Sequence, residues 1–144
     1  RRHTRSLCDW SSDVCSSDLL NKVASGGELA RVMLALRLVL TQAPPTLVFD
    51  EVDAGIGGTA AVAVGNALRE VSRGHQVFVV THLAQVAARA DVQVGITKEV
   101  SRNQTRVTAT ILGKAERVEE IARMLSGGEA KEAAKRTARE MLSA

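Results

Sequence analysis

The chain has 144 residues, of which 45% are apolar and 24% are charged, and its formal net charge is +3. This length holds one globular domain and excludes a multidomain assembly. No run of five basic residues occurs, so nucleic-acid binding by a dense cationic segment is not supported, and no apolar stretch approaches the roughly 18 to 20 residues of a membrane-spanning helix.

The first eighteen residues differ from the rest of the chain. Residues 1–18 contain the only Trp and both Cys, show no helical or strand periodicity, and lack the continuous apolar segment of a signal peptide. His3, Cys8 and Cys15 match no common zinc-site spacing. We interpret residues 1–18 as a non-native leader, and we expect residues 19–144 to form the domain.

A strand–helix–strand unit is predicted after a first helix. The helix begins at Ser25, carries an apolar stripe and ends before two prolines. A short apolar strand ending in acids, typical of a buried parallel strand, follows; then come a glycine-rich turn, a helix, a second apolar strand and a short helical segment. The stripe residues are Leu29, Met33, Leu36 and Leu40, and the later elements are 46–50, 54–58, 59–72, 76–82 and 83–89.

The remainder of the chain predicts an antiparallel hairpin and two helices. Residues 91–98 and 105–112 alternate between apolar and polar side chains around a polar turn. Residues 116–125 and 129–142 have helical spacing. The expected fold class is therefore α/β, with parallel strands, flanking helices, and a terminal hairpin and helices.

The tetrad Ser-Gly-Gly-Glu occurs twice, at 25–28 and 126–129. Ser25 and Glu28 fit a capping box, which would explain both residues without a ligand. Gly26 and Gly27 are costly inside a helix, and at a helix N-terminus they would let a phosphate approach the backbone, so both interpretations stay open for the first copy. The second copy precedes only a charged helix, so we assign it to a turn and to helix capping.

Three candidate site residues cluster at the ends of the two predicted strands. Asp50 and Glu51 follow the first strand and His82 ends the second, so a parallel pair would bring them to the same edge of the sheet. One carboxylate could hold a cation through water while the other faces a nucleophile. Asp53 lies in the glycine-rich turn, where turn chemistry alone could account for it.

These residues together resemble the ATP-binding-cassette ATPases, in the branch related to SMC proteins. The sequence SGGE at 25–28 is similar to the family signature, LVFDE at 47–51 to Walker B with its catalytic glutamate, Asp53 to the D-loop and His82 to the switch histidine. Further similarity at 22–24, 52–58, 80–87 and 123–125 is to the C-terminal ATPase lobe of a bacterial DNA repair family. The resemblance implies the C-terminal half of a P-loop head.

The resemblance also implies a mechanism. ATP would bind between two copies of the head, with Ser25, Gly26, Gly27 and Glu28 of one head at the γ-phosphate held by the other. Asp50 would hold Mg²⁺, Glu51 would polarise water, His82 would sense the γ-phosphate, and Asp53 would link the paired sites. DNA would be a partner of the full-length protein, which would act in double-strand break repair in the bacterial cytoplasm, associated with the nucleoid and not with a membrane.

Two other functions stay open at this point. A transporter ATPase is one, although such proteins usually carry a proline in the turn after the acids and this chain does not. An inactive interaction lobe is the other, because the sequence contains no G-x-x-x-x-G-K-[ST] phosphate loop. We therefore expect the isolated chain to hydrolyse no ATP.

Overall fold

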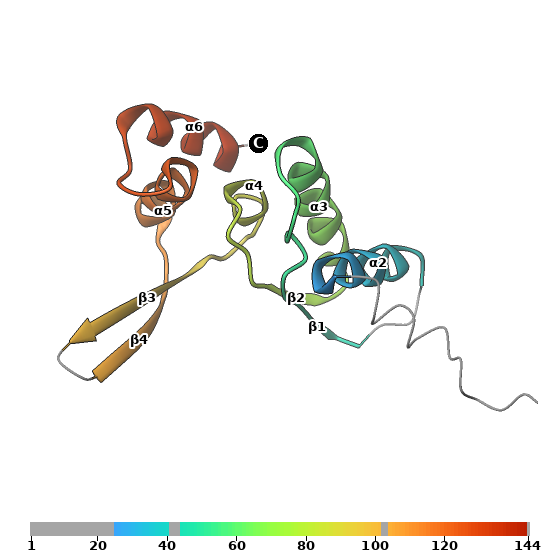
Figure 1. The fold of residues 1–144 in the computed structure, drawn as a ribbon. Helices are drawn as coiled ribbons and strands as arrows, with labels where there is room; N and C mark the ends of the chain where they lie inside the picture. Colours follow the sequence, from blue (N-terminus) through green and yellow to red (C-terminus); the bar gives the residue numbers. More distant parts are fainter. Residues whose placement is uncertain (1–24, 41–43, 102–103, 144) are drawn as a thin grey trace, which may run out of the picture.

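The computed structural model describes residues 25–40, 44–101 and 104–143, so the leader proposed for 1–18 and the similarity at 22–24 lie outside the described residues. Five helices and four strands are present in the described part (Figure 1). The helices are α2 (Gly26–Val39), α3 (Gly58–Val71), α4 (Ala84–Ala87), α5 (Lys114–Ser126) and α6 (Glu132–Ser143). The strands are β1 (Thr46–Phe49), β2 (Gln76–Val79), β3 (Val94–Ser101) and β4 (Gln104–Ile111).

The strand–helix–strand prediction is confirmed. Strands β1 and β2 pair in parallel, from Thr46 opposite Gln76 to Phe49 opposite Val79, and α3 connects them. The N–H of Val80 continues the ladder by donating to the carbonyl of Phe49 at 2.9 Å. Residues that follow the two strands therefore lie at one edge of this sheet, as the sequence predicted.

The expectation of fully buried strands is wrong for this chain. Leu47 and Phe49 of β1 are buried, but Val48 between them is 70% exposed, and Phe78 on β2 is 53% exposed. Side chains alternate between the two faces of a strand, and within the described residues the helices cover only one face of β1 and β2. Apolar composition alone did not reveal that the other face is open.

The buried face of α2 also differs from the predicted stripe. Gly27 and Leu34 are the buried residues of α2, whereas Met33, Leu36 and Leu40 are 42–54% exposed. The helix packs toward α3, and Gly27 on its buried face lies against the turn after β1. Leu29 and Met33 instead line an open groove of about 330 Å³ that continues to Asp50.

Two apolar clusters hold the described fold together, and α4 contributes to both. Val86 of α4 joins the cluster formed by α2, β1, the following turn and α3, while Ala84, Ala87 and Ala88 join the cluster formed with α5 and α6. The short helix α4 thus connects the packing of α2, β1 and α3 to that of α5 and α6.

Every helix in the described part of the chain is too short to span a lipid bilayer.

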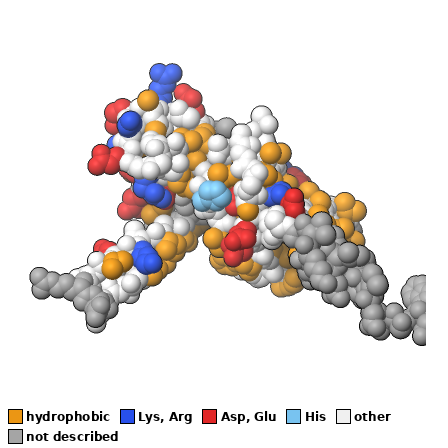
Figure 2. Space-filling model, in the orientation of Figure 1, with side chains coloured by type: hydrophobic (Ala, Val, Ile, Leu, Met, Phe, Trp, Pro, Cys, Tyr) orange, Lys and Arg blue, Asp and Glu red, His pale blue; other side chains and the backbone are white. Residues whose placement is uncertain are grey.

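The predicted hairpin is confirmed and projects away from the helices (Figure 1). Its register places Val94, Ile96 and Val100 on the same face as Val107 and Ile111, and all five are at least half exposed. Apolar side chains are visible along this arm in Figure 2. The sequence alternation predicted the strands, but it did not predict that both faces of the arm would be exposed.

Candidate nucleotide site

The N-terminus of α2 is closed by a capping box. The Oγ of Ser25 accepts a hydrogen bond from the N–H of Glu28 at 3.3 Å, and the N–H of Ser25 donates to Oε2 of Glu28 at 2.9 Å. The backbone N–H of Ser25, followed by its side chain, lowers the pKa of Glu28 below 4.5 because both stabilise the carboxylate. The capping interpretation therefore accounts for Ser25 and Glu28.

The two glycines between them meet the turn that follows β1. A Cβ on Gly27 would lie 2.8 Å from the Cβ of Ala54 and 2.8 Å from the carbonyl oxygen of Glu51. A Cβ on Gly26 would lie 3.1 Å from Oε2 of Glu51. Packing within the chain therefore requires glycine at Gly27, while Gly26 is exposed and its position is next to a flexible carboxylate.

Glu51 has an unusual backbone conformation. Its φ is +56°, and it is the only residue other than glycine with a positive φ in the described part of the chain. Such conformations cost about 1–3 kcal/mol and cluster at functional sites. Asp50 and Glu51 are both exposed, so the turn presents two carboxylates to solvent beside the start of α2.

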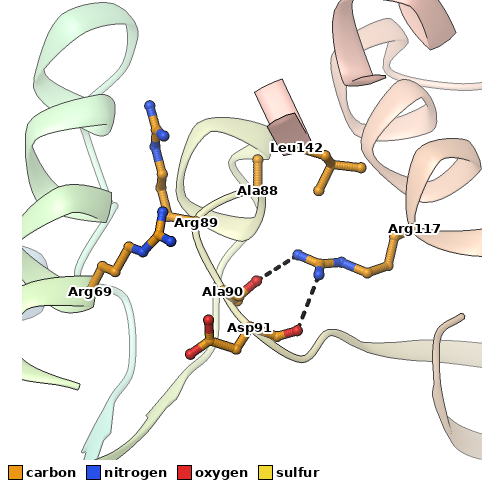
Figure 3. Close-up of a pocket in the computed structure, with 7 residues that line it drawn as sticks. All are labelled: Arg69, Ala88, Arg89, Ala90, Asp91, Arg117 and Leu142. Carbon is orange, nitrogen blue, oxygen red and sulfur yellow. Dashed lines mark hydrogen bonds between the residues drawn. The ribbon is translucent and has the colours of Figure 1, made fainter. Parts of the chain in front are cut away.

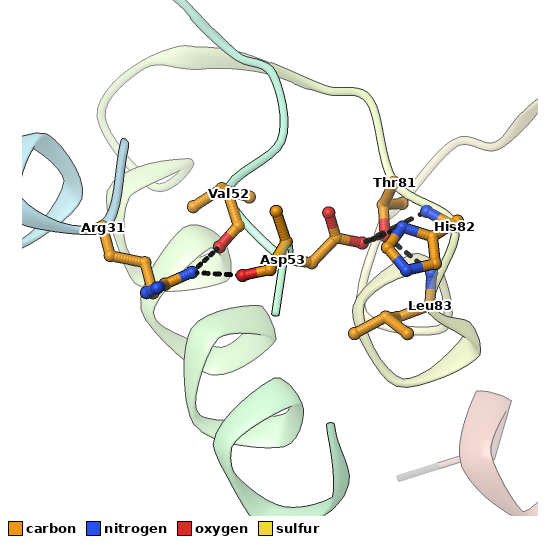
Figure 4. A network of polar contacts seen from close by, with 7 residues as sticks. Arg31, Val52, Asp53, Thr81, His82 and Leu83 are labelled. Atoms are coloured by element: carbon orange, nitrogen blue, oxygen red, sulfur yellow. Dashed lines mark hydrogen bonds and ion pairs between the residues drawn. The ribbon is translucent and has the colours of Figure 1, made fainter. Parts of the chain in front are cut away.

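Arg31 of α2 holds the same turn from the other side. Its Nη1 donates to the carbonyl of Ala54 at 2.8 Å and to that of Val52 at 3.3 Å (Figure 4). These two bonds link α2 directly to the residues on both sides of Asp53. Sequence analysis missed Arg31, although its position six residues after Ser25 places it on the helix that the tetrad opens.

Asp53 joins the ends of the two parallel strands. Its carboxylate is almost fully buried, and its Oδ2 accepts from Oγ1 of Thr81 at 2.5 Å and from the backbone N–H of His82 at 3.1 Å (Figure 4). Nδ1 of His82 lies 3.4 Å from the same oxygen, and Thr81 Oγ1 also accepts from the N–H of Leu83 at 3.0 Å. Thr81 is a second residue that sequence analysis missed.

His82 is therefore held by Asp53 at its backbone N–H and on the Nδ1 side of its ring, although the side chain is exposed. Its side chain is 72% exposed, while that of Asp53 is 2% exposed. A buried carboxylate that orients one side of an exposed imidazole leaves the other ring nitrogen available for a ligand. Within this chain Asp53 acts as a support for His82, and whether it also links paired sites stays a prediction.

The second Ser-Gly-Gly-Glu tetrad has a different role. Ser126 is the last residue of α5, and Gly127 follows it in the left-handed conformation, with φ +67°, that ends many helices. A Cβ on Gly128 would meet nothing within 4 Å. The assignment to a turn and to capping is confirmed, with the correction that this tetrad ends α5 and does not start α6.

The carboxylate of Asp50 suits a magnesium ion that is also bound by the phosphates of a nucleotide. Within residues 25–40, 44–101 and 104–143, no three His, Cys, Asp or Glu side chains are grouped to hold a metal by themselves. Mg²⁺ in nucleotide sites takes one or two carboxylates and completes its shell with water and phosphate oxygens. Asp50, exposed at the end of β1, offers that one carboxylate, so the donor set fits an ion that arrives with a nucleotide.

Sequence comparisons relate the chain to a DNA repair protein. No family model matches the chain. It is 54% identical over 124 residues to "DNA repair protein RecN" of Deinococcus radiodurans and 46% identical over 125 residues to that of Bacillus subtilis. The first match covers 86% and the second 85% of this chain, and each covers 22% of the relative, so the chain spans about a fifth of their length.

Structure comparisons give the fold class. A Pyrococcus yayanosii Smc head domain with a coiled coil and joint matches with a TM-score of 0.55 and 25% identity, covering 74% of this chain and 20% of that one. An SMC ATPase studied for ATP-driven dimerization and DNA stimulated activation matches with a TM-score of 0.50 and 25% identity, covering 66% and 58%. The expected fold, part of an SMC-type P-loop ATPase head, is thus confirmed, and the chain is homologous to DNA repair protein RecN over about 85% of its length.

Proposed function

We propose that this chain supplies the signature, Walker B, D-loop and switch-histidine half of a RecN-like ATPase, which couples ATP hydrolysis between two heads to DNA double-strand break repair. One observation supports the proposal most: the exposed carboxylates of Asp50 and Glu51 lie beside the start of α2 and share a sheet edge with His82. Three motifs that are separate in the sequence thereby lie close together at the surface, and the fourth residue, Asp53, is buried beneath His82.

Each residue has a role that its position can support. The bound nucleotide and Mg²⁺ would supply the phosphoanhydride and the charge that activates it. Asp50 would bind the ion through its exposed carboxylate, and Glu51 would orient and polarise water from the strained turn. His82, held through its backbone N–H by Asp53, would hydrogen bond to the terminal phosphate.

The first tetrad would bind the terminal phosphate through backbone amides. The N–H groups of Gly26 and Gly27 occupy the first two positions of α2 and have no acceptor within the helix. They are donors of the kind that binds phosphate at a helix N-terminus. Because Oε2 of Glu51 lies near Gly26 in the same chain, a phosphate bound by these amides would need that carboxylate to move or would come from a second copy of the head.

The test uses a chimera, because the chain itself lacks a phosphate loop. The matching segment of Deinococcus radiodurans RecN, 124 residues long, is replaced with that of this chain, and Glu51→Gln is introduced. The amide keeps the size of the side chain but cannot act as a base, so steady-state ATP hydrolysis should fall by about 100-fold or more. ATP-dependent dimerisation, measured by light scattering, should persist.

Loss of ATP binding in the Glu51→Gln chimera would contradict this role, since it would make Glu51 a structural residue or an ion ligand. Turnover equal to that of the unmodified chimera would contradict it as well. Glu129→Gln, in the tetrad that ends α5, is the matched control and should leave both activities unchanged.

A further inference from the structure

A hollow of about 230 Å³ lies between α3, the segment after α4, and α5 (Figure 3). Its charged lining consists of Arg69, Arg89, Arg117 and Asp91. None of the residues proposed for nucleotide binding lines it. The three arginines are far apart in the sequence, so they form no basic run.

Arg117 is held in place without being neutralised. Its Nη2 donates to the carbonyl of Ala90 at 2.6 Å and its Nη1 to the carbonyl of Asp91 at 3.2 Å (Figure 3). Its Nε is buried and has no acceptor among the described residues. Carbonyl oxygens fix the guanidinium but carry no net charge, so a full positive charge and one buried donor remain to be satisfied.

Arg69 and Arg89 add two more charges that the described residues do not neutralise. Neither side chain forms an ion pair there, and the carboxylate of Asp91 forms none either. The stem of Arg89 is seated against Gly65, where an added Cβ would lie 3.1 Å from its Cγ. Arg69 lies in the last turn of α3, where the helix dipole favours a cation, but this does not explain the other two arginines.

This arrangement fits an oxyanion with several acceptor oxygens. A planar guanidinium group can donate two parallel hydrogen bonds to two oxygens of one phosphate. An ammonium group lacks this paired arrangement. The hollow is smaller than the roughly 300–1,000 Å³ of whole small-molecule sites, so it accommodates one phosphate group of a larger molecule. The lining holds three cations and one carboxylate, so the balance of charge favours such a group.

We propose that this hollow binds one backbone phosphate of DNA through Arg69, Arg89 and Arg117. The choice of DNA as the source of the phosphate rests on the proposed function, whereas the phosphate chemistry rests on the hollow alone. The site lies apart from the nucleotide residues, so DNA would be held by the head without occupying the ATP site.

The test measures binding of the 144-residue chain to a fluorescein-labelled 20-base-pair duplex by anisotropy, without nucleotide, across a salt series. The double variant Arg69→Gln/Arg89→Gln is compared with Arg106→Gln/Arg136→Gln, which removes the same charge from exposed positions on β4 and α6. The first should bind about tenfold more weakly than the second. Its slope of log affinity against log salt should be smaller by about 1 to 2.

Thermal melting of both double variants shows whether they fold, and Arg89→Lys provides a second variant that keeps the charge. Arg89→Lys should bind DNA better than Arg89→Gln but less tightly than the unmodified chain. An equal loss of DNA affinity in the two double variants would overturn the proposal, because the loss would then depend only on the net charge removed and not on its position. Protection of the arginine Nε–H signals by inorganic phosphate but not by the duplex would overturn DNA as the source.

ATP turnover plays no part in this assay, so its outcome is separate from that of the Glu51→Gln experiment. Unchanged DNA binding by Arg69→Gln/Arg89→Gln, together with the expected effect of Glu51→Gln on chimera turnover, would contradict the proposal for the hollow alone. A DNA affinity that depends on Arg69 and Arg89, together with no effect of Glu51→Gln on turnover, would contradict the nucleotide site alone.

Discussion

Gly27→Ala should destabilise the chain, although alanine favours helices over glycine. The added Cβ would lie 2.8 Å from both the Cβ of Ala54 and the carbonyl oxygen of Glu51, which is too close for any real contact. Overpacking of this kind costs about 1–3 kcal/mol, and better helix propensity returns at most about 1 kcal/mol. Two contacts this short, one of them with a backbone oxygen, put the cost in the upper part of that range, at about 2–3 kcal/mol, so the expected net loss is about 1–2 kcal/mol of unfolding free energy.

Thermal unfolding followed by circular dichroism measures this loss. For a chain of this length the midpoint should fall by about 4–8 °C. Gly128→Ala is the matched control, because Gly128 holds the same place in the second tetrad and its Cβ would meet nothing within 4 Å. A drop of the same size in both variants, or no drop for Gly27→Ala, would refute the argument that the first tetrad packs on the turn.

Three further predictions concern the same region. Thr81→Val should lower the unfolding free energy by about 1–3 kcal/mol, measured by urea denaturation, because the buried carboxylate of Asp53 loses its donor. Glu28→Gln should reduce the loss of thermal stability on acidification, because the folded-state pKa of Glu28 is below 4.5, so its contribution is present above that pH and lost as the pH falls through the lowered value. Gly26→Asp should abolish ATP hydrolysis in the chimera with little change in melting, since Gly26 is exposed and its near neighbour is the end of a flexible side chain.

Each of these predictions has its own control. Thr81→Ser keeps a hydroxyl at Asp53 and should retain most of the stability, so equal losses for serine and valine would contradict the hydrogen-bond argument. Glu129→Gln should leave the acid sensitivity unchanged, because the described residues give its carboxylate no partner. Full turnover by the Gly26→Asp chimera would exclude phosphate binding at the start of α2.

The sequence predicted the elements well because their signals are local. Two prolines end the first helix, and the spacing of apolar residues marks α3, the hairpin and the last helices. The parallel pairing of β1 and β2 followed from the strand–helix–strand order, and it correctly brought Asp50 and His82 to one edge. These inferences need only neighbouring residues and a known rule of connection.

The sequence did not predict which faces are buried. Met33 and Leu36 were expected in the core, yet α2 turns Gly27 and Leu34 inward, because the turn after β1 leaves room only for a glycine there. That constraint comes from a segment more than twenty residues away along the chain. Periodicity within one helix contains no information about it.

The supporting residues of the site were missed for a similar reason. Thr81 and Arg31 belong to no motif by themselves, and their roles depend on bonds to Asp53 and to the carbonyls of Val52 and Ala54. The sequence singled out Asp53 as a candidate, but it did not indicate that the carboxylate is buried and bonded to Thr81 and His82 at the end of the other strand. Contacts between distant segments decide such roles, and spacing in the sequence does not record them.

The arrangement of the ATP site between two heads is the central claim, and a mixing experiment tests it directly. One chimera carries Gly26→Asp and the other Glu51→Gln, and each alone should be inactive. In the two-head arrangement, the first tetrad of one head completes the site that contains Asp50 and Glu51 of the other head. Random pairing then gives half of the dimers one intact site of two, so ATP hydrolysis should recover to about a quarter of the unmodified rate. If Gly26 and Glu51 act only within one chain, where they are neighbours, every mixed dimer lacks an intact site and no turnover will return.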